Sequence, residues 1–124
     1  MNKHELEERL IDFSTQIIEI VHSLPDSKTA NHLGGQLLRS GTSTALNYGE
    51  AQSGESRRDF IHKINIVLKE LRECNICMKL ILRSKLLNSE VLVPALNENN
   101  ELISIFVKSV ETAKKNEQRI LSSK

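Results

Sequence analysis

The most regular pattern of hydrophobic and polar positions lies near the middle of the chain. Apolar side chains recur there alternately four and three residues apart, at Phe60, Ile64, Val67, Leu71, Cys74, Met78 and Ile81. This spacing is typical of a helix that buries one stripe against the other helices of a bundle. It predicts a helix over residues 57–86, which Ser56 is placed to cap together with Asp59.

Three further segments carry helical patterns, at residues 3–23, 29–52 and 89–120. Pro25 ends the first segment because proline cannot continue the helical hydrogen-bond ladder, and Gly54 suits the turn after the second. Ser89 is expected to cap the last helix, whose early position tolerates Pro94. Because the links are short, we predict an all-α fold, an antiparallel up-down-up-down four-helix bundle in one domain over residues 1–124.

The segment at residues 29–52 carries two neighbouring stripes of small and apolar side chains. One stripe contains Leu33, Leu37, Ser40, Thr44, Asn47 and Ala51, and the other contains Gly34, Leu38, Gly41, Ala45 and Tyr48. Glycine costs about 1 kcal/mol relative to alanine inside a helix, so the glycines indicate either close approach of another backbone or a weak helix. One bundle core needs one stripe from each helix. The second stripe is therefore predicted to be a subunit interface.

Length and composition limit the classes of function. A chain of 124 residues, with aliphatic rather than aromatic apolar side chains, is long enough to bury a core without disulfides. No apolar run reaches the length of a membrane span, and the polar N-terminal residues do not form a signal-peptide pattern. We therefore expect a cytoplasmic protein that does not act at a membrane.

The side chains that carry chemistry do not gather into a recognisable site. Cys74 and Cys77 form a CxxC motif inside a helix, whereas redox pairs lie at a helix start and zinc sites need four ligands. Buried packing is predicted for both, with metal or redox chemistry as the alternative. The histidines lack the Glu-x-x-His pattern of metal-binding bundles. We expect no enzyme activity, no catalytic residue, no metal, no cofactor and no small-molecule substrate.

The net charge of +1 conceals an uneven distribution. Residues 1–35 contain three basic and six acidic residues, whereas residues 36–87 contain nine basic and five acidic residues. The central hairpin is thus the basic part of the chain, although a dedicated nucleic-acid domain is usually more basic. The candidate interaction or anion-binding residues of this hairpin are Arg39, Asn47, Glu50, Arg57, Arg58, Lys63 and Lys69.

Two of these candidates, Arg57 and Arg58, open a predicted helix at the end where the helix dipole disfavours cations. Either Glu50, Glu55 or Asp59 pairs with them, or an anion such as phosphate binds there. Proximity in the sequence favours internal pairing.

Five basic residues continue along the same predicted helix: Lys63, Lys69, Arg72, Lys79 and Arg83. They form either a solvated face with local ion pairs or a stripe that touches nucleic-acid phosphates. Because the chain has so few aromatic side chains, such binding would be electrostatic and indifferent to base sequence.

Four runs of this hairpin resemble a known family. They are residues 36–43 (QLLRSGTS), 47–51 (NYGEA), 56–63 (SRRDFIHK) and 68–73 (LKELRE), within residues 36–82. The chain is identified by them as similar to the bacterial four-helix-bundle family named for proteins encoded in 23S ribosomal RNA intervening sequences. That family is also similar to the accessory variability protein of diversity-generating retroelements.

The resemblance implies assembly into a homopentameric ring and a role with nucleic acid or a ribonucleoprotein partner, and it carries over no catalytic residue. Two hypotheses follow. The favoured one is a non-enzymatic oligomeric protein that acts as an interaction or scaffold module. The alternative is a weak, sequence-nonspecific nucleic-acid-binding module that uses the basic hairpin.

Overall fold

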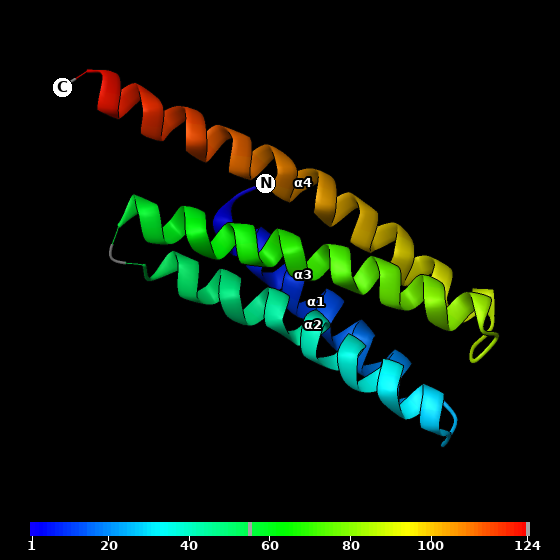
Figure 1. The fold of residues 1–124 in the computed structure, drawn as a ribbon. Coiled ribbons are helices and arrows are strands. Elements are labelled where there is room, and N and C mark those ends of the chain that lie inside the picture. The colour runs from blue at the N-terminus through cyan, green and yellow to red at the C-terminus, as the bar shows by residue number, and fades with distance from the viewer. Residues whose placement is uncertain (55, 124) are drawn as a thin grey trace.

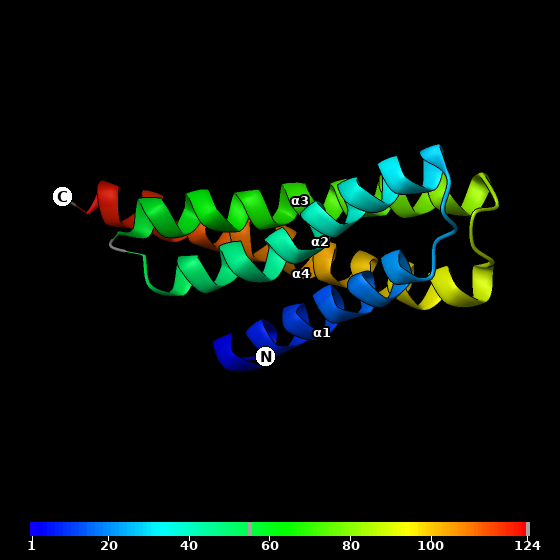
Figure 2. The ribbon, with the colours of Figure 1, turned by 90° about the horizontal axis from the view of Figure 1, so that it is seen from below.

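The computed structural model describes residues 1–54 and 56–123, and four helices make up almost all of this part of the chain. They are α1 (Lys3–His22), α2 (Lys28–Gln52), α3 (Arg57–Arg83) and α4 (Ser89–Ser122). Each helix packs against the next in chain order, and α4 returns to α1. The connections alternate between the two ends of the molecule (Figures 1 and 2). The predicted all-α, up-down-up-down bundle is confirmed for the described residues.

A polar side chain caps the start of every helix by accepting a backbone N–H three residues on, at Asn2, Ser27, Ser56 and Asn88. Ser56 was predicted, and its Oγ accepts from the N–H of Asp59 at 3.1 Å. The prediction of Ser89 as a cap is wrong, because Asn88 takes that position and Ser89 begins the helix. α4 also extends two residues beyond the predicted position 120.

The end of α3 lies at Arg83 and not at the predicted residue 86. Lys85 adopts a left-handed backbone with φ 58°, and the N–H of Leu86 reaches back to the carbonyl of Ile81 at 3.2 Å. This is a common way to satisfy the last carbonyls of a helix while turning the chain away from its axis.

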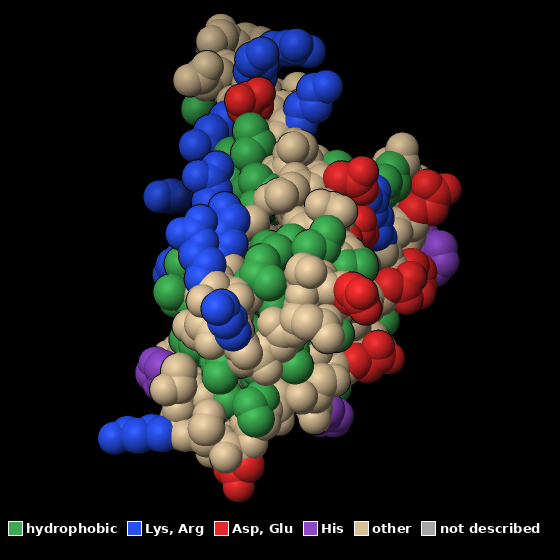
Figure 3. Space-filling model, turned by 90° about the vertical axis from the view of Figure 1, so that its right-hand side faces the viewer, with side chains coloured by type: hydrophobic (Ala, Val, Ile, Leu, Met, Phe, Trp, Pro, Cys, Tyr) green, Lys and Arg blue, Asp and Glu red, His purple; other side chains and the backbone are tan. Residues whose placement is uncertain are grey.

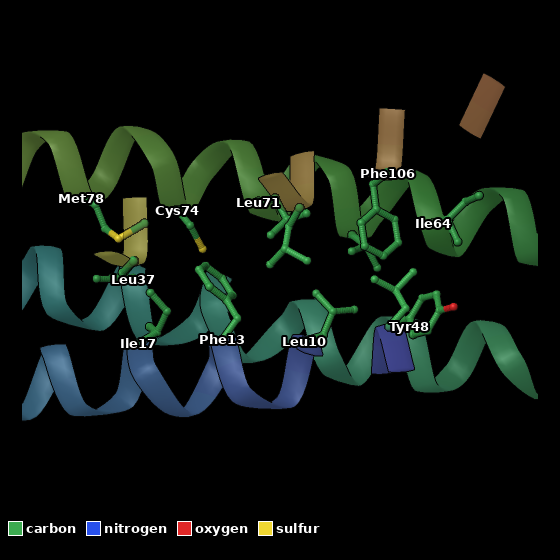
Figure 4. Packing of buried hydrophobic residues seen from close by; sticks show 14 of the residues in the cluster. Leu10, Phe13, Ile17, Leu37, Tyr48, Ile64, Leu71, Cys74, Met78 and Phe106 are labelled. Atoms are coloured by element: carbon green, nitrogen blue, oxygen red, sulfur yellow. The ribbon is translucent and has the colours of Figure 1, made fainter. Parts of the chain in front are cut away.

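The core runs along the bundle axis as one continuous seam (Figure 4). The predicted stripe of α3 is fully buried from Ile64 to Ile81, and only its first member, Phe60, stays half-buried. Tyr48 of α2 meets Phe106 of α4 edge to face, with ring centroids 5.6 Å apart. This contact joins two helices that lie diagonally opposite each other, and it closes the core near one end.

α1 approaches α2 very closely at Gly41. A Cβ atom at this position would lie 2.6 Å from Ile17 Cγ2, which is nearer than carbon atoms can pack. Ser14 Oγ uses the same proximity to donate a hydrogen bond to the Gly41 carbonyl at 2.9 Å. The close-packing interpretation of the glycines therefore holds at Gly41, where the neighbour is α1 of the same chain.

The prediction that the second stripe of α2 is surplus to one chain is wrong. Gly34, Gly41 and Tyr48 are buried within the bundle of the single subunit. α2 packs against α1 on one side and α3 on the other, so it needs both stripes. Of the five predicted interface residues, only Leu38 and Ala45 remain partly open to solvent.

Two Gly→Ala substitutions in α2, one at the close contact with α1 and one at an open position, test this packing by comparison. Gly41→Ala should lower the free energy of unfolding by about 1–3 kcal/mol, because the new methyl group collides with Ile17. Gly35→Ala should raise it by roughly 0.5–1 kcal/mol, because nothing lies within 4 Å of its Cβ and alanine favours the helix. Urea denaturation followed by circular dichroism measures both. Equal effects of the two substitutions would contradict the close approach.

Candidate interaction surfaces

Arg39 does not project freely from α2 but bridges to two carboxylates of α3. Its guanidinium contacts Glu70 at 3.3 Å and Glu73 at 2.5 Å. The Glu70 side chain is only 8% exposed, and this burial is the main cause that raises its pKa. The pKa of Glu73 is lowered, first by a hydrogen bond from Ser40 and then by Arg39. Arg39 therefore stabilises the α2–α3 contact and is engaged within the chain.

The other predicted residues near the hinge have partners different from those expected. Glu50 forms an ion pair with Lys63, which lies nearly two turns into α3. Within the part of the chain that the structure describes, neither Arg57 nor Arg58 pairs with Glu50 or Asp59, so that prediction is wrong for these two acids. Helical geometry explains the change, because Lys63 lies on the side of α3 that faces α2.

Two predictions at the hinge have different outcomes. Glu55, the third expected partner of Arg57 and Arg58, lies outside the described residues. The side-chain amide of Asn47 forms hydrogen bonds within its own helix, since Nδ2 donates to the carbonyl and the hydroxyl of Ser43 at 2.9 and 2.7 Å. Asn47 is thus held by local hydrogen bonds.

One face of α3 carries only basic charge. Five side chains on it are exposed and recur at helical spacing: Arg58, Lys69, Arg72, Lys79 and Arg83. The acids Glu70 and Glu73 both contact Arg39 of α2, so their carboxylates are engaged at the side of α3 that faces α2. From Arg58 to Arg83 the stripe extends about 37 Å at 1.5 Å per residue. We call these five residues the α3 basic face.

Acidic charge gathers on the other side of the molecule. Figure 3 shows a column of Lys and Arg side chains along one side and Asp and Glu side chains along the opposite side. Exposed acids of α1 include Glu5, Glu8, Asp12 and Glu19. The cation of Arg9 on α1 does not neutralise these acids, because it binds Glu98 of α4 at 2.7 Å and also contacts Glu101. The subunit is therefore electrically polar across its width.

A third surface lies along the outer edge between α1 and α2 and contains several exposed apolar side chains. The register set by the Ser14–Gly41 hydrogen bond places Ile11 near the level of Thr44 and Ala45, and Ile18 near the level of Leu37 and Leu38. Ile11 is 43% exposed, Leu38 37% and Leu46 66%. We call this set the α1–α2 apolar face; its members are Ile11, Ile18, Leu38, Thr42, Ala45 and Leu46. Exposed apolar side chains that gather along one edge are typical of an interface.

The two cysteines are packing residues, as predicted. Both are buried, Cys77 Sγ lies 3.3 Å from the Leu33 carbonyl, and burial raises the pKa of each thiol. Among the residues described, no three His, Cys, Asp or Glu side chains come together in a way that could hold a metal ion. No helix within the same residues is long and apolar enough to cross a bilayer.

Sequence reasoning missed the α1–α2 apolar face. Its signal was the set of apolar residues, such as Ile11 and Leu46, that fall outside the core stripes of their own helices. Sequence reasoning also missed the partners of Arg39 and Arg9, because the spacing of residues within one helix contains no information about the register between two helices.

Comparisons with known proteins agree with this architecture. A sequence model described as the 23S rRNA-intervening sequence protein family matches residues 2–108. The crystal structure at 1.70 Å of a protein of unknown function from the S23 ribosomal protein family of Bacteroides thetaiotaomicron superposes with a TM-score of 0.82. It is 28% identical and covers 90% of this chain, which in turn covers 99% of it. Comparison with curated protein sequences gives no match.

Replacing Arg39 should show how much the buried Glu70 carboxylate lowers the free energy of unfolding when it has no cation beside it. Arg39→Ala should lower the free energy of unfolding at pH 7 by about 1–3 kcal/mol, because Glu70 loses its cation. The raised pKa of Glu70 lies above its unfolded value, so protonation favours the folded state and the deficit should shrink as the pH falls toward about 5. Urea denaturation at both pH values measures this.

The matched control is Lys63→Ala, which breaks the ion pair with the exposed Glu50. It should cost no more than about 0.5 kcal/mol at either pH, since exposed pairs contribute little. If Lys63→Ala proved as costly as Arg39→Ala, burial of Glu70 would not be the cause.

Proposed function

Because the chain belongs to the family of 23S rRNA-intervening sequence proteins, we propose that it is a non-enzymatic interaction module that assembles with copies of itself. The α1–α2 apolar face carries this proposal. Its exposed members include Leu46 and Ile11. Burial of these apolar side chains by a second subunit would be favourable, because it removes apolar surface from water. The assembled protein would act as a scaffold for a protein or ribonucleoprotein partner.

The composition of the face favours close contact between identical subunits. Thr42 and Ala45 are small, so a neighbouring helix could approach between Leu38 and Leu46. A contact between this face and a different surface of the next copy is heterologous, and such contacts close into rings when the rotation allows it. Five subunits are the number that the family resemblance implies.

A charge placed in the α1–α2 apolar face should disrupt self-association. Leu46→Glu should reduce the mass measured by light scattering toward that of the 14.0 kDa chain, because the new carboxylate would be desolvated in the contact. The fold should survive, since the Leu46 side chain is 66% exposed. Circular dichroism of the same sample verifies this.

Ile76→Glu is the matched control, because Ile76 is similarly exposed at 58% but lies on α3. It should leave the mass unchanged. A wild-type protein that is monomeric at micromolar concentration would refute self-assembly. Loss of assembly only in Ile76→Glu would move the interface to α3.

The α3 basic face supports a second candidate function, binding to the phosphates of nucleic acid. Its five cations extend along one face of a rigid helix with no acidic residue of α3 among them. Three of the four aromatic side chains, Phe13, Tyr48 and Phe106, are buried, and the half-buried Phe60 does not belong to this face, so the face offers unstacked bases no aromatic platform. Binding of this kind would depend on the backbone charge and not on base sequence. Assembly would present several copies of the face together and raise the effective affinity.

Neutralising two cations of this face should weaken RNA binding. Arg72→Gln with Lys79→Gln should lower the affinity for an RNA duplex of about 20 base pairs and reduce the slope of log K against log salt by about 1.8, because two phosphate contacts are lost. Fluorescence anisotropy over a range of salt concentrations measures both. Lys114→Gln with Lys115→Gln, on exposed positions of α4, is the matched control. Equal loss in the two double variants would show that only net charge matters.

A further inference from the structure

The bundle is not four helices thick along its whole length. α1 has 20 residues, whereas α4 has 34. Arg9 sits beside Glu98 and Glu101, and the two helices are antiparallel, so Lys3 lies near the level of residue 105 of α4. Beyond that level α4 continues along α3 without α1 beside it, as Figures 1 and 2 show.

A groove of about 470 Å³ occupies the space where α1 would continue. Phe60 of α3 and Ile105 and Ala113 of α4 provide its apolar lining, and Ser109 and Thr112 of α4 also face it. Phe60 is the one member of the α3 seam that stays half-buried, because α1 does not extend far enough to cover it. The groove therefore exposes part of what is closed core at the other end of the bundle.

The groove has the shape and spacing of a helix-binding track. The α4 positions that face α1 begin with Glu98, Glu101 and Ile105, and the same stripe continues through Ser109 and Thr112 at steps of three and four residues. Small side chains along such a stripe allow another helix to approach closely. About three helical turns fit along it, since the eleven steps from Ile105 to Asn116 give a rise of about 16 Å.

The charge at the groove selects the kind of helix. Arg57 and Lys108 line it, and no acidic residue does so among the described residues. This reverses the polarity found further along α4, where the carboxylates of Glu98 and Glu101 receive Arg9 of α1. A helix with the charge pattern of that part of α1 would be mismatched here, whereas one with acidic flanks would be complementary.

We propose that this groove binds a short amphipathic helix of a partner protein, with an apolar stripe seated on Phe60, Ile105 and Ala113 and with Glu or Asp side chains flanking that stripe toward Arg57 and Lys108. The contact resembles the general mode in which an amphipathic helix lies in an apolar groove. It is separate from the α1–α2 apolar face and from the α3 basic face, so one subunit could use all three at once.

Two synthetic peptides of about three to four helical turns test the proposal. They share one apolar stripe and differ only in the flanking residues, which are Glu in the first peptide and Lys in the second. Fluorescence anisotropy with the full-length protein should show that the Glu peptide binds roughly tenfold more tightly, as two partly exposed ion pairs allow. Equal affinity of the two peptides, or no binding of either, would overturn the proposal.

Variants of the protein locate the binding. Arg57→Glu with Lys108→Glu should reverse the preference, so that the Lys peptide binds more tightly. Lys79→Glu with Arg83→Glu makes the same change of charge on the α3 basic face and should leave the preference for the Glu peptide in place. If the second pair of substitutions also reversed the preference, overall charge would be the cause and the groove assignment would fail.

A groove-filling variant separates a foreign partner from a second copy of the chain. Thr112→Trp, at an exposed position, should abolish binding of the Glu peptide without changing the mass measured by light scattering. A fall in mass would show that a second subunit occupies the groove, which would overturn the assignment to a partner protein. Helical circular dichroism confirms that each variant is folded, so failure here remains distinct from failure of the α1–α2 apolar face.

Discussion

The close approach of α1 to α2 at Gly41 determines much of the rest of the structure. Because a single methyl group would collide with Ile17, the two helices can pack this closely only where α2 lacks a side chain. The approach draws Gly34 and Tyr48 into the core of one subunit. It also brings the outer edges of both helices together, so that both contribute exposed apolar side chains, such as Ile11 and Leu46, to the α1–α2 apolar face. The surface proposed for assembly is thus a by-product of packing within the chain.

Ion pairs between neighbouring helices decide which charges are left for other molecules. Arg39 forms ion pairs with Glu70 and Glu73 between α2 and α3. Arg9 forms ion pairs with Glu98 and Glu101 between α1 and α4. The carboxylates of Glu70 and Glu73 are therefore paired with a cation of α2 and not with the cations of α3. What remains is an acidic α1 and a basic α3 on one diagonal of the bundle, although the net charge of the chain is only +1. Net charge alone would have hidden this polarity.

The sequence was sufficient for the fold and insufficient for the surfaces. The regular spacing of Ile64, Leu71 and Met78 predicted α3 because burial of a stripe requires only the helix period. α2 was harder, because its two stripes both pack within the chain and a single-helix pattern cannot show how many neighbours a helix has. The groove beside Ile105 depends on where α1 begins relative to α4. That level follows from the register of two helices far apart in the chain, and residue spacing within one helix does not encode it.

The edge-to-face contact of Tyr48 with Phe106 gives the protein an intrinsic optical probe. The chain has one tyrosine and no tryptophan, so its ultraviolet fluorescence comes from this one buried ring. Tyr48 belongs to α2 and Phe106 to α4, so the environment of the ring depends on closure of the bundle across its diagonal. Any event that loosens the bundle near the groove would change the emission of a single residue. The state of the core at that end can thus be followed without a label.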